Sequence, residues 1–148
     1  MNHVHSQKLL SGAVITGIIN AVINGIINWF QVKGLAGIKL TTDSISSTEH
    51  TVMSGAIILA FTLSVIIASI AYFTVKVEGK PKYFPFAFLV TLRNAFFLFG
   101  LFVTMAILWQ RFAGTVEVSP LFAACIVGVV AGLVAGVTDY LTKKELFK

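Results

Sequence analysis

Three asparagines recur at four-residue steps near the N-terminus, and their side chains bring hydrogen-bonding chemistry into an apolar run. These are Asn20, Asn24 and Asn28. On a helix, residues at this spacing stack along one face. An unpaired amide that faces lipid tails is unfavourable, because it gives up its hydrogen bonds to water. We therefore expect this asparagine row to face another helix, a symmetry mate or a water-filled space.

Two interpretations of the asparagine row stay open. An asparagine at a helix interface contributes about 0.6 to 2 kcal/mol of interhelical hydrogen bonding, so the row could serve to hold helices together. Three amides in register exceed that need, which favours a wet surface that contacts a ligand. Thr16 and Gln31 lie close to the row and would extend it.

Arg93 is a charge well inside the third apolar run, and Asn94 follows it directly. A guanidinium at this depth snorkels to the headgroups, pairs with a carboxylate, or attracts an anion. Asp139 in the fourth run is the carboxylate to consider, because antiparallel helices would bring both residues into the same half of a bilayer. The other partner open to Asp139 is Lys143, one helical turn further along its own helix.

Glycines recur at four-residue steps in the fourth apolar run, at Gly128, Gly132 and Gly136, and Ala124 extends the series. This spacing lets two helix backbones approach closely, and such packing drives helix association in lipid. We expect the glycine row to pack against a helix of the same chain or of a second copy. The second possibility predicts a homo-oligomer formed through the fourth helix.

The sequence contains few residues that could support catalysis or bind a metal. Covalent catalysis needs a Ser or Cys beside a base, and the apolar runs supply no such pair. Cys125 is the only cysteine, which excludes an intramolecular disulfide and a CxxC motif. His3, His5 and His50 lack the spacing of metal ligands. We predict no enzymatic activity, no cofactor and no metal.

Four long apolar runs must position these residues. Of the 148 residues, 57% are hydrophobic and 11% are charged, and the mean hydropathy is +0.90, whereas soluble domains carry about 25% charged residues. A helix of about 20 apolar residues crosses a bilayer. The runs lie at about 9–31, 52–75, 84–108 and 119–141. The sequence predicts one all-α domain, a four-transmembrane-helix bundle whose partner is the lipid bilayer.

The connections between the runs are short and polar. Residues 34–50 are rich in Gly, Thr and Ser and are expected to form a solvent-exposed loop. Within it, Ser46 and Glu49 resemble a capping box that opens the second helix. Pro120 stands at the start of the fourth run, at a position that helices tolerate.

Basic residues beside the runs predict the orientation. Those on the side of the termini are Lys8, Lys76, Lys80, Lys82, Lys143, Lys144 and Lys148, and those on the other side are Lys33, Lys39 and Arg111. Cytoplasmic loops carry the excess of Lys and Arg, so both termini are predicted to be cytoplasmic. The net charge of +5 is thereby explained without nucleic acid. The sequence contains no Asn-x-Ser/Thr acceptor, which fits a multi-pass protein of a bacterial inner membrane.

These residues together favour a small channel or transporter for a small neutral or anionic solute. The asparagine row would line the outer half of the path, and Arg93 would guard the inner half, because a buried guanidinium repels cations. A second hypothesis is a scaffold, accessory or immunity-type subunit that recognises other helices. A third is lipid binding beside Phe96 and Phe97.

Overall fold

The computed structural model describes the backbone of residues 3–42 and 51–147, which is nearly all helical. Its α-helices are α1 (His3–Val32), α2 (Val52–Thr74), α3 (Phe88–Ala113) and α4 (Pro120–Leu146). A π-helical turn, η1 (Tyr83–Ala87), precedes α3, and two short strands are β1 (Ile38–Leu40) and β2 (Val116–Val118). Four helices in the described ranges are long and apolar enough to cross a membrane.

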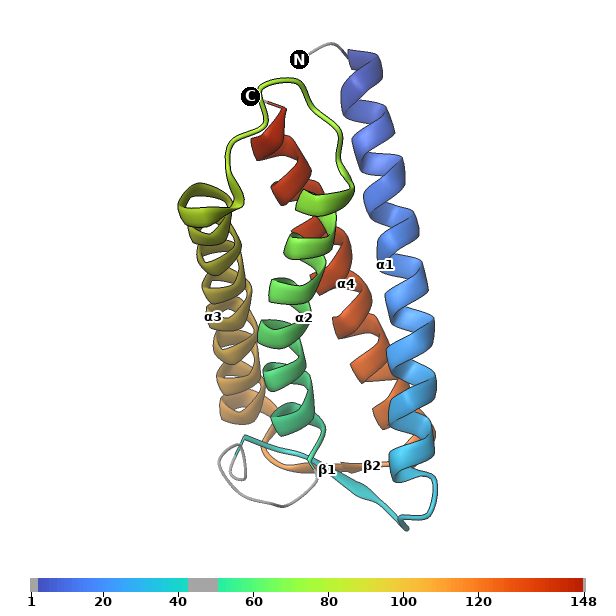
Figure 1. The fold of residues 1–148 in the computed structure, drawn as a ribbon. Helices are drawn as coiled ribbons and strands as arrows, with labels where there is room; N and C mark the ends of the chain where they lie inside the picture. The colour runs from blue at the N-terminus through green and yellow to red at the C-terminus, as the bar shows by residue number, and fades with distance from the viewer. Residues whose placement is uncertain (1–2, 43–50, 148) are drawn as a thin grey trace.

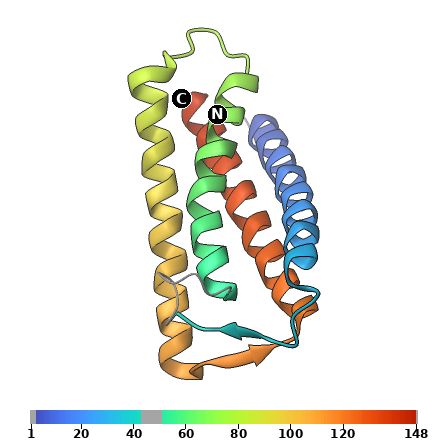
Figure 2. The same ribbon diagram turned by 60° about the horizontal axis from the view of Figure 1, so that its bottom comes forward.

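The four α-helices lie side by side, and α4 is the central one. In Figures 1 and 2, α4 runs between α1 and α2, while α3 lies on the far side of α2 from α1. Correspondingly, α1 packs along α4, and α2 packs against both α4 and α3. Both chain termini lie at one end of the bundle, and the two strands lie at the other. We call these the terminal end and the sheet end.

The buried apolar residues form three layers along the bundle. The middle layer includes Ala60, Leu98 and Val134, from three different helices. A layer at the sheet end contains Ile38 and Leu40 of β1 together with Val32, Val52, Ala123 and Val127. A layer at the terminal end contains Tyr72, Ala87 and Leu146. The middle layer therefore lies between α2, α3 and α4, while α1 contributes Val32 to the sheet-end layer and otherwise packs along α4.

The helix ends follow from local side-chain chemistry. The Ser54 backbone N–H donates to Thr51 Oγ1 at 3.2 Å, and the Thr51 N–H donates to Ser54 Oγ at 3.3 Å, which is a capping box. At the start of α4, Ser119 accepts a hydrogen bond from the Phe122 N–H, and Pro120 occupies the first turn. At the end of α2, Lys80 Nζ donates to the carbonyls of Tyr72 and Val75.

Two expectations about the element boundaries change, and a third falls partly outside the described residues. First, α3 continues to Ala113 and α4 to Leu146, rather than ending near residues 108 and 141. Second, the turn Tyr83–Ala87 has non-helical backbone at Phe84, so α3 begins at Phe88 rather than near residue 84. Third, α2 begins after Thr51, and the capping box expected from Ser46 and Glu49 lies outside the described residues.

The connection after α1 is not entirely a solvent-exposed loop. Within it, β1 pairs antiparallel with β2, and Lys39 lies opposite Glu117. Ile38 and Leu40 are buried while Lys39 between them is exposed, the alternation expected of a strand with one face on the core. The sheet thus joins the connection after α1 to the one before α4.

Candidate functional site

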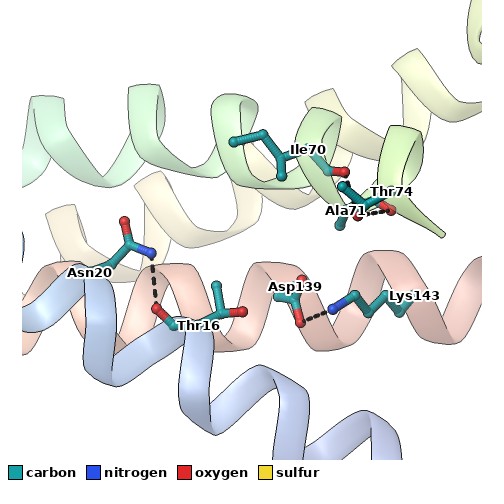
Figure 3. A network of polar contacts seen from close by, with 7 residues as sticks. All are labelled: Thr16, Asn20, Ile70, Ala71, Thr74, Asp139 and Lys143. Atoms are coloured by element: carbon teal, nitrogen blue, oxygen red, sulfur yellow. Dashed lines mark hydrogen bonds and ion pairs between the residues drawn. The ribbon is translucent and has the colours of Figure 1, made fainter.

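Asn20, Asn24 and Asn28 are all half-buried. Asn28 shares a pocket with Thr51 and Ser54 at the start of α2, so the row lies on the flank of α1 that is turned toward α2. Asn20 Nδ2 donates to the Thr16 carbonyl at 2.9 Å, and Asn24 Nδ2 donates to the Asn20 carbonyl at 2.9 Å. Figure 3 shows the Asn20 side chain on the side of α1 that faces α2, next to α4. A backbone carbonyl can only accept, so each amide uses one N–H on its own helix, and its Oδ1 and the second N–H of Nδ2 remain.

Asn28 continues the row into a small pocket at the sheet end. The pocket has a volume of about 80 Å³, and its polar lining comes from Asn28, Gln31, Thr51 and Ser54. Asn28 Oδ1 is buried and accepts no hydrogen bond from any described residue. A buried acceptor without a hydrogen bond lowers the stability of the fold by about 1–3 kcal/mol. The pocket therefore suits a molecule that donates a hydrogen bond.

Asp139 and Lys143 of α4 form an ion pair at the other end of the row. Lys143 Nζ lies 2.7 Å from Asp139 Oδ2, and the Asp139 side chain is only 5% exposed. At 1.5 Å of rise per residue, Asp139 lies about 10 Å before the end of α4. Figure 3 shows the pair on the same side of α4 as Thr16 and Asn20 of α1. We call the set Thr16, Asn20, Asn24, Asn28, Asp139 and Lys143 the polar seam.

Arg93 and Asp139, considered above as possible partners, do not meet. Arg93 instead pairs with Glu145 at 3.1 Å, its side chain is 60% exposed, and Asp139 has the intrahelical partner Lys143. Arg93 belongs to α3, which lies on the opposite side of the bundle from α1 (Figures 1 and 2). Within one chain Arg93 is therefore separate from the polar seam, and its expected place at the inner half of a path stays a prediction.

The glycine row of α4 packs against α1 within the chain. A Cβ added at Gly128 would lie 2.8 Å from the Ala21 carbonyl oxygen, and one added at Gly17 would lie 2.8 Å from the Gly132 oxygen. Gly136 similarly faces Ala13. The partner row on α1, which runs through Ala13, Gly17, Ala21 and Gly25, was not singled out from the sequence, although its four-residue spacing is visible there. An oligomer formed through the α4 row would have to displace α1.

The other flank of the α1–α4 interface is apolar. Two grooves lie along it, with volumes of about 460 and 500 Å³. The first is lined by residues such as Val14, Ile18 and Leu133. The second includes the side chains of Val22 and Cys125. The contact between α1 and α4 thus separates a polar flank, which carries the asparagine row, from an apolar one.

A second group of polar side chains is buried between α2, α3 and α4. Thr91 and Asn94 fall between Ala87 and Leu98 on α3, and Thr138 and Thr142 fall between Val134 and Leu146 on α4, so both pairs lie between the middle and terminal core layers. Thr138 donates to Ser64 of α2 at 3.3 Å.

Other groups of this buried polar layer are unpaired. Thr91 Oγ1, Asn94 Nδ2 and Thr142 Oγ1 have no hydrogen-bond partner within residues 3–42 and 51–147. Asn94 Oδ1 accepts only a long hydrogen bond, at 3.5 Å, from Arg93. Of the expected Arg93–Asn94 site, the structure therefore exposes the guanidinium and buries the amide.

Together these features define a four-helix bundle with the length and apolarity of a membrane-spanning protein and one polar seam beside its core. Comparison with known proteins finds no matching family model, no matching curated protein and no matching solved structure. In the described ranges, no three His, Cys, Asp or Glu side chains group as metal ligands.

Proposed function

We propose that this chain is a small multi-pass membrane transport protein, a channel or transporter-like bundle in which a small solute moves along the polar seam. The observation that carries the proposal is the position of Asn20, Asn24 and Asn28. All three are half-buried on the flank of α1 turned toward α2, while the outward face of α1 carries Val and Ile. Polar side chains within a membrane-spanning helix that face the protein interior mark solute and ion paths.

The Asp139–Lys143 pair supports the same proposal. A buried pair is only weak evidence for stability, because desolvation of both charges offsets much of their attraction. Its place beside Thr16 and Asn20 extends the polar surface from the sheet end toward the terminal end. The polar seam thus runs along most of the length of α1.

We further propose that both termini are cytoplasmic, in a bacterial inner membrane. Lys76, Lys80, Lys82 and Lys144 lie at the terminal end, whereas Lys33, Lys39 and Arg111 lie near the sheet end, and cytoplasmic segments carry the excess of basic residues. In this orientation the Asn28 pocket lies toward the outer surface and the ion pair lies in the cytoplasmic half.

Solute flux into proteoliposomes tests the proposal. Asn24→Leu removes an amide from the middle of the polar seam, and Ile23→Leu is the matched control on the outward face. We expect Asn24→Leu to slow flux about tenfold, because one lost hydrogen bond of about 1.5 kcal/mol corresponds to that factor in rate. Ile23→Leu should leave flux unchanged. Equal flux in both variants, with helix content intact by circular dichroism, would contradict the proposal.

A second candidate function is that of a scaffold or accessory subunit, and the apolar grooves beside α1 and α4 favour it. An apolar helix could lie in them, as could a lipid acyl chain. A foreign subunit that copurifies in fixed stoichiometry and is lost on Leu133→Trp, but not on Ile58→Trp outside the grooves, would favour this candidate over transport.

A further inference from the structure

Another cavity, of about 470 Å³, lies between α2, α3 and α4 at the sheet end, away from the polar seam. Both α3 and α4 pack against α2 but make little contact with each other. We propose that this cavity binds one acyl chain of a bilayer phospholipid, inserted from the side between α3 and α4. The inference rests on the proposed membrane insertion and goes beyond the transport function. The cavity is separate from the lipid contact expected beside Phe96 and Phe97, which do not line it.

The lining of the cavity is apolar and comes from all three helices and both strands. It includes Ile57 of α2, Phe102 of α3 and Ile126 of α4. Among the lining residues none is charged, and the Trp109 indole is the only side chain that can donate a hydrogen bond. A polar occupant would give up its hydrogen bonds to water there without replacing them. The occupant that fits this lining is therefore a hydrocarbon chain.

The cavity runs from the outer surface of the bundle into its core. At the mouth, Met105 of α3 and Phe122 of α4 line it while each is 56% exposed. At the inner end it reaches Ile57, which is only 2% exposed. A helix is about 10 Å wide and could not contact Ile57 without separating α3 from α4. A single methylene chain is much narrower and could enter without that movement.

The two strands close the cavity at the sheet end of the bundle. In Figure 2, β2 connects the end of α3 to the start of α4. Val116 and Val118 of β2 belong to the lining, together with Leu40 of β1. Entry is therefore from the side, where a helix in a membrane faces acyl chains rather than water. This position favours a lipid of the bilayer over a hydrophobic ligand that arrives from solution.

The size of the cavity fits one chain. Along α3 the lining extends from Phe102 to Trp109, which is about 10 Å at 1.5 Å of rise per residue. A volume of about 470 Å³ holds about 15 groups of the size of a water molecule, at roughly 30 Å³ each. A methylene group is of similar size, so the cavity holds one acyl chain but not both chains of a phospholipid. The second chain and the headgroup would stay in the surrounding bilayer.

Native mass spectrometry of the full chain tests the inference. The protein is reconstituted into phosphatidylcholine vesicles and extracted into a mild detergent, and we expect it to retain one phosphatidylcholine per chain. Val130→Phe places a ring in the cavity and should lower the lipid-bound fraction about tenfold, because the ring takes the space of several methylene groups. Val129→Phe is the matched control, since Val129 lines the α1–α4 grooves and not this cavity.

A second measurement uses the wild type alone. Lysophosphatidylcholine has one acyl chain and should displace the retained phosphatidylcholine, because only one chain enters the cavity. If Val130→Phe does not fold, as judged by circular dichroism, this displacement decides the outcome.

Lipid that is lost in Val130→Phe and kept in Val129→Phe supports the inference. Any other pattern in the two folded variants overturns it, as does a wild type that retains no lipid or a retained lipid that the lysolipid does not displace. Membrane insertion is tested separately, by quenching of the fluorescence of Trp29 and Trp109 in vesicles of a phosphatidylcholine with brominated acyl chains. Quenching without a retained lipid overturns this inference alone. If neither tryptophan is quenched, the proposed membrane insertion fails as well.

Discussion

Asp139 has its carboxylate almost fully buried in α4, and its charge is balanced by Lys143 one turn away. A charge that loses its partner in a buried site remains desolvated, so removal of one member is more damaging than replacement of both. The same principle does not apply to Arg93 and Glu145, because the Arg93 side chain is 60% exposed and solvent screens the pair.

Lys143→Met is expected to lower the free energy of unfolding by about 3 kcal/mol, since it leaves Asp139 buried and unpaired. Lys144→Met is the matched control, because Lys144 is exposed and lies 5.8 Å from the Tyr140 ring centre. Denaturant titration in micelles, followed by circular dichroism, measures both. The double variant Asp139→Leu with Lys143→Met should recover most of the loss, and a single variant no worse than the control would show that the pair is hydrated.

Thr91 differs from Asp139, because its fully buried Oγ1 has no hydrogen-bond partner among the described residues. Removing this hydroxyl should therefore stabilise the bundle. Thr91→Val keeps the shape and removes the unpaired hydroxyl, so we expect the free energy of unfolding to rise by about 1 kcal/mol. Thr138→Val is the control, since its hydroxyl is bonded to Ser64, and it should lower stability by about 1 kcal/mol. If Thr91→Val also destabilises the bundle, water occupies the buried polar layer.

The site could be predicted from the sequence only where its members lie on one helix. The four-residue spacing of Asn20, Asn24 and Asn28 placed them on one face, and Lys143 was already a possible partner of Asp139. The pairing of Arg93 with Glu145 depends on the position of α3 along the axis of α4. A local sequence pattern does not determine this position. The Asn28 pocket likewise needs the N-terminal cap of α2 as its second wall.

At the scale of elements, the contact between α1 and α4 depends on two rows of small residues. Because α1 packs mainly on α4, this contact holds the helix that carries the asparagine row. A Cβ added to the α4 row would meet backbone atoms, which cannot move aside as a flexible side chain can. The position of the polar seam therefore depends on the absence of side chains at these glycines.

Gly128→Ala tests this contact, because its Cβ would lie 2.8 Å from the Ala21 carbonyl oxygen. We expect the free energy of unfolding to fall by about 1–3 kcal/mol from overpacking. Gly100→Ala in α3 is the matched control, with no heavy atom within 4 Å of its Cβ. It should raise stability by about 0.5–1 kcal/mol through helix propensity. Stabilisation by both substitutions, measured by thermal unfolding in micelles, would show that α1 and α4 are not in close contact.

The four helices could be predicted because their length and apolarity are properties of the local sequence. The C-terminal end of α4 could not, because α4 continues through Lys143, Lys144 and Glu145, where the apolar run has stopped. Cations in a last helical turn interact favourably with the helix dipole, so the helix continues beyond the end of its apolar run. The strands were missed because Ile38–Leu40 is a three-residue element whose partner lies before α4, beyond any local window.

At the scale of the whole molecule, the two ends of the bundle differ in charge and structure. The terminal end holds both chain termini and the lysines around the α2–α3 connection, and the sheet end holds the two strands. A bundle with such a bias should insert in one direction, with its more basic end inside. Under the proposed transport function, orientation also decides which end of the polar seam faces the outside.

Cysteine labelling in intact cells tests this orientation. In a Cys125→Ser background, Ala36→Cys and Lys76→Cys each place one thiol at an exposed position, the first near the sheet end and the second at the terminal end. We expect a membrane-impermeant maleimide to label Ala36→Cys at once and Lys76→Cys only after permeabilisation, because the basic end stays in the cytoplasm. The reverse pattern would place the Asn28 pocket on the cytoplasmic side. Equal labelling of both would mean that the charge bias does not fix one orientation.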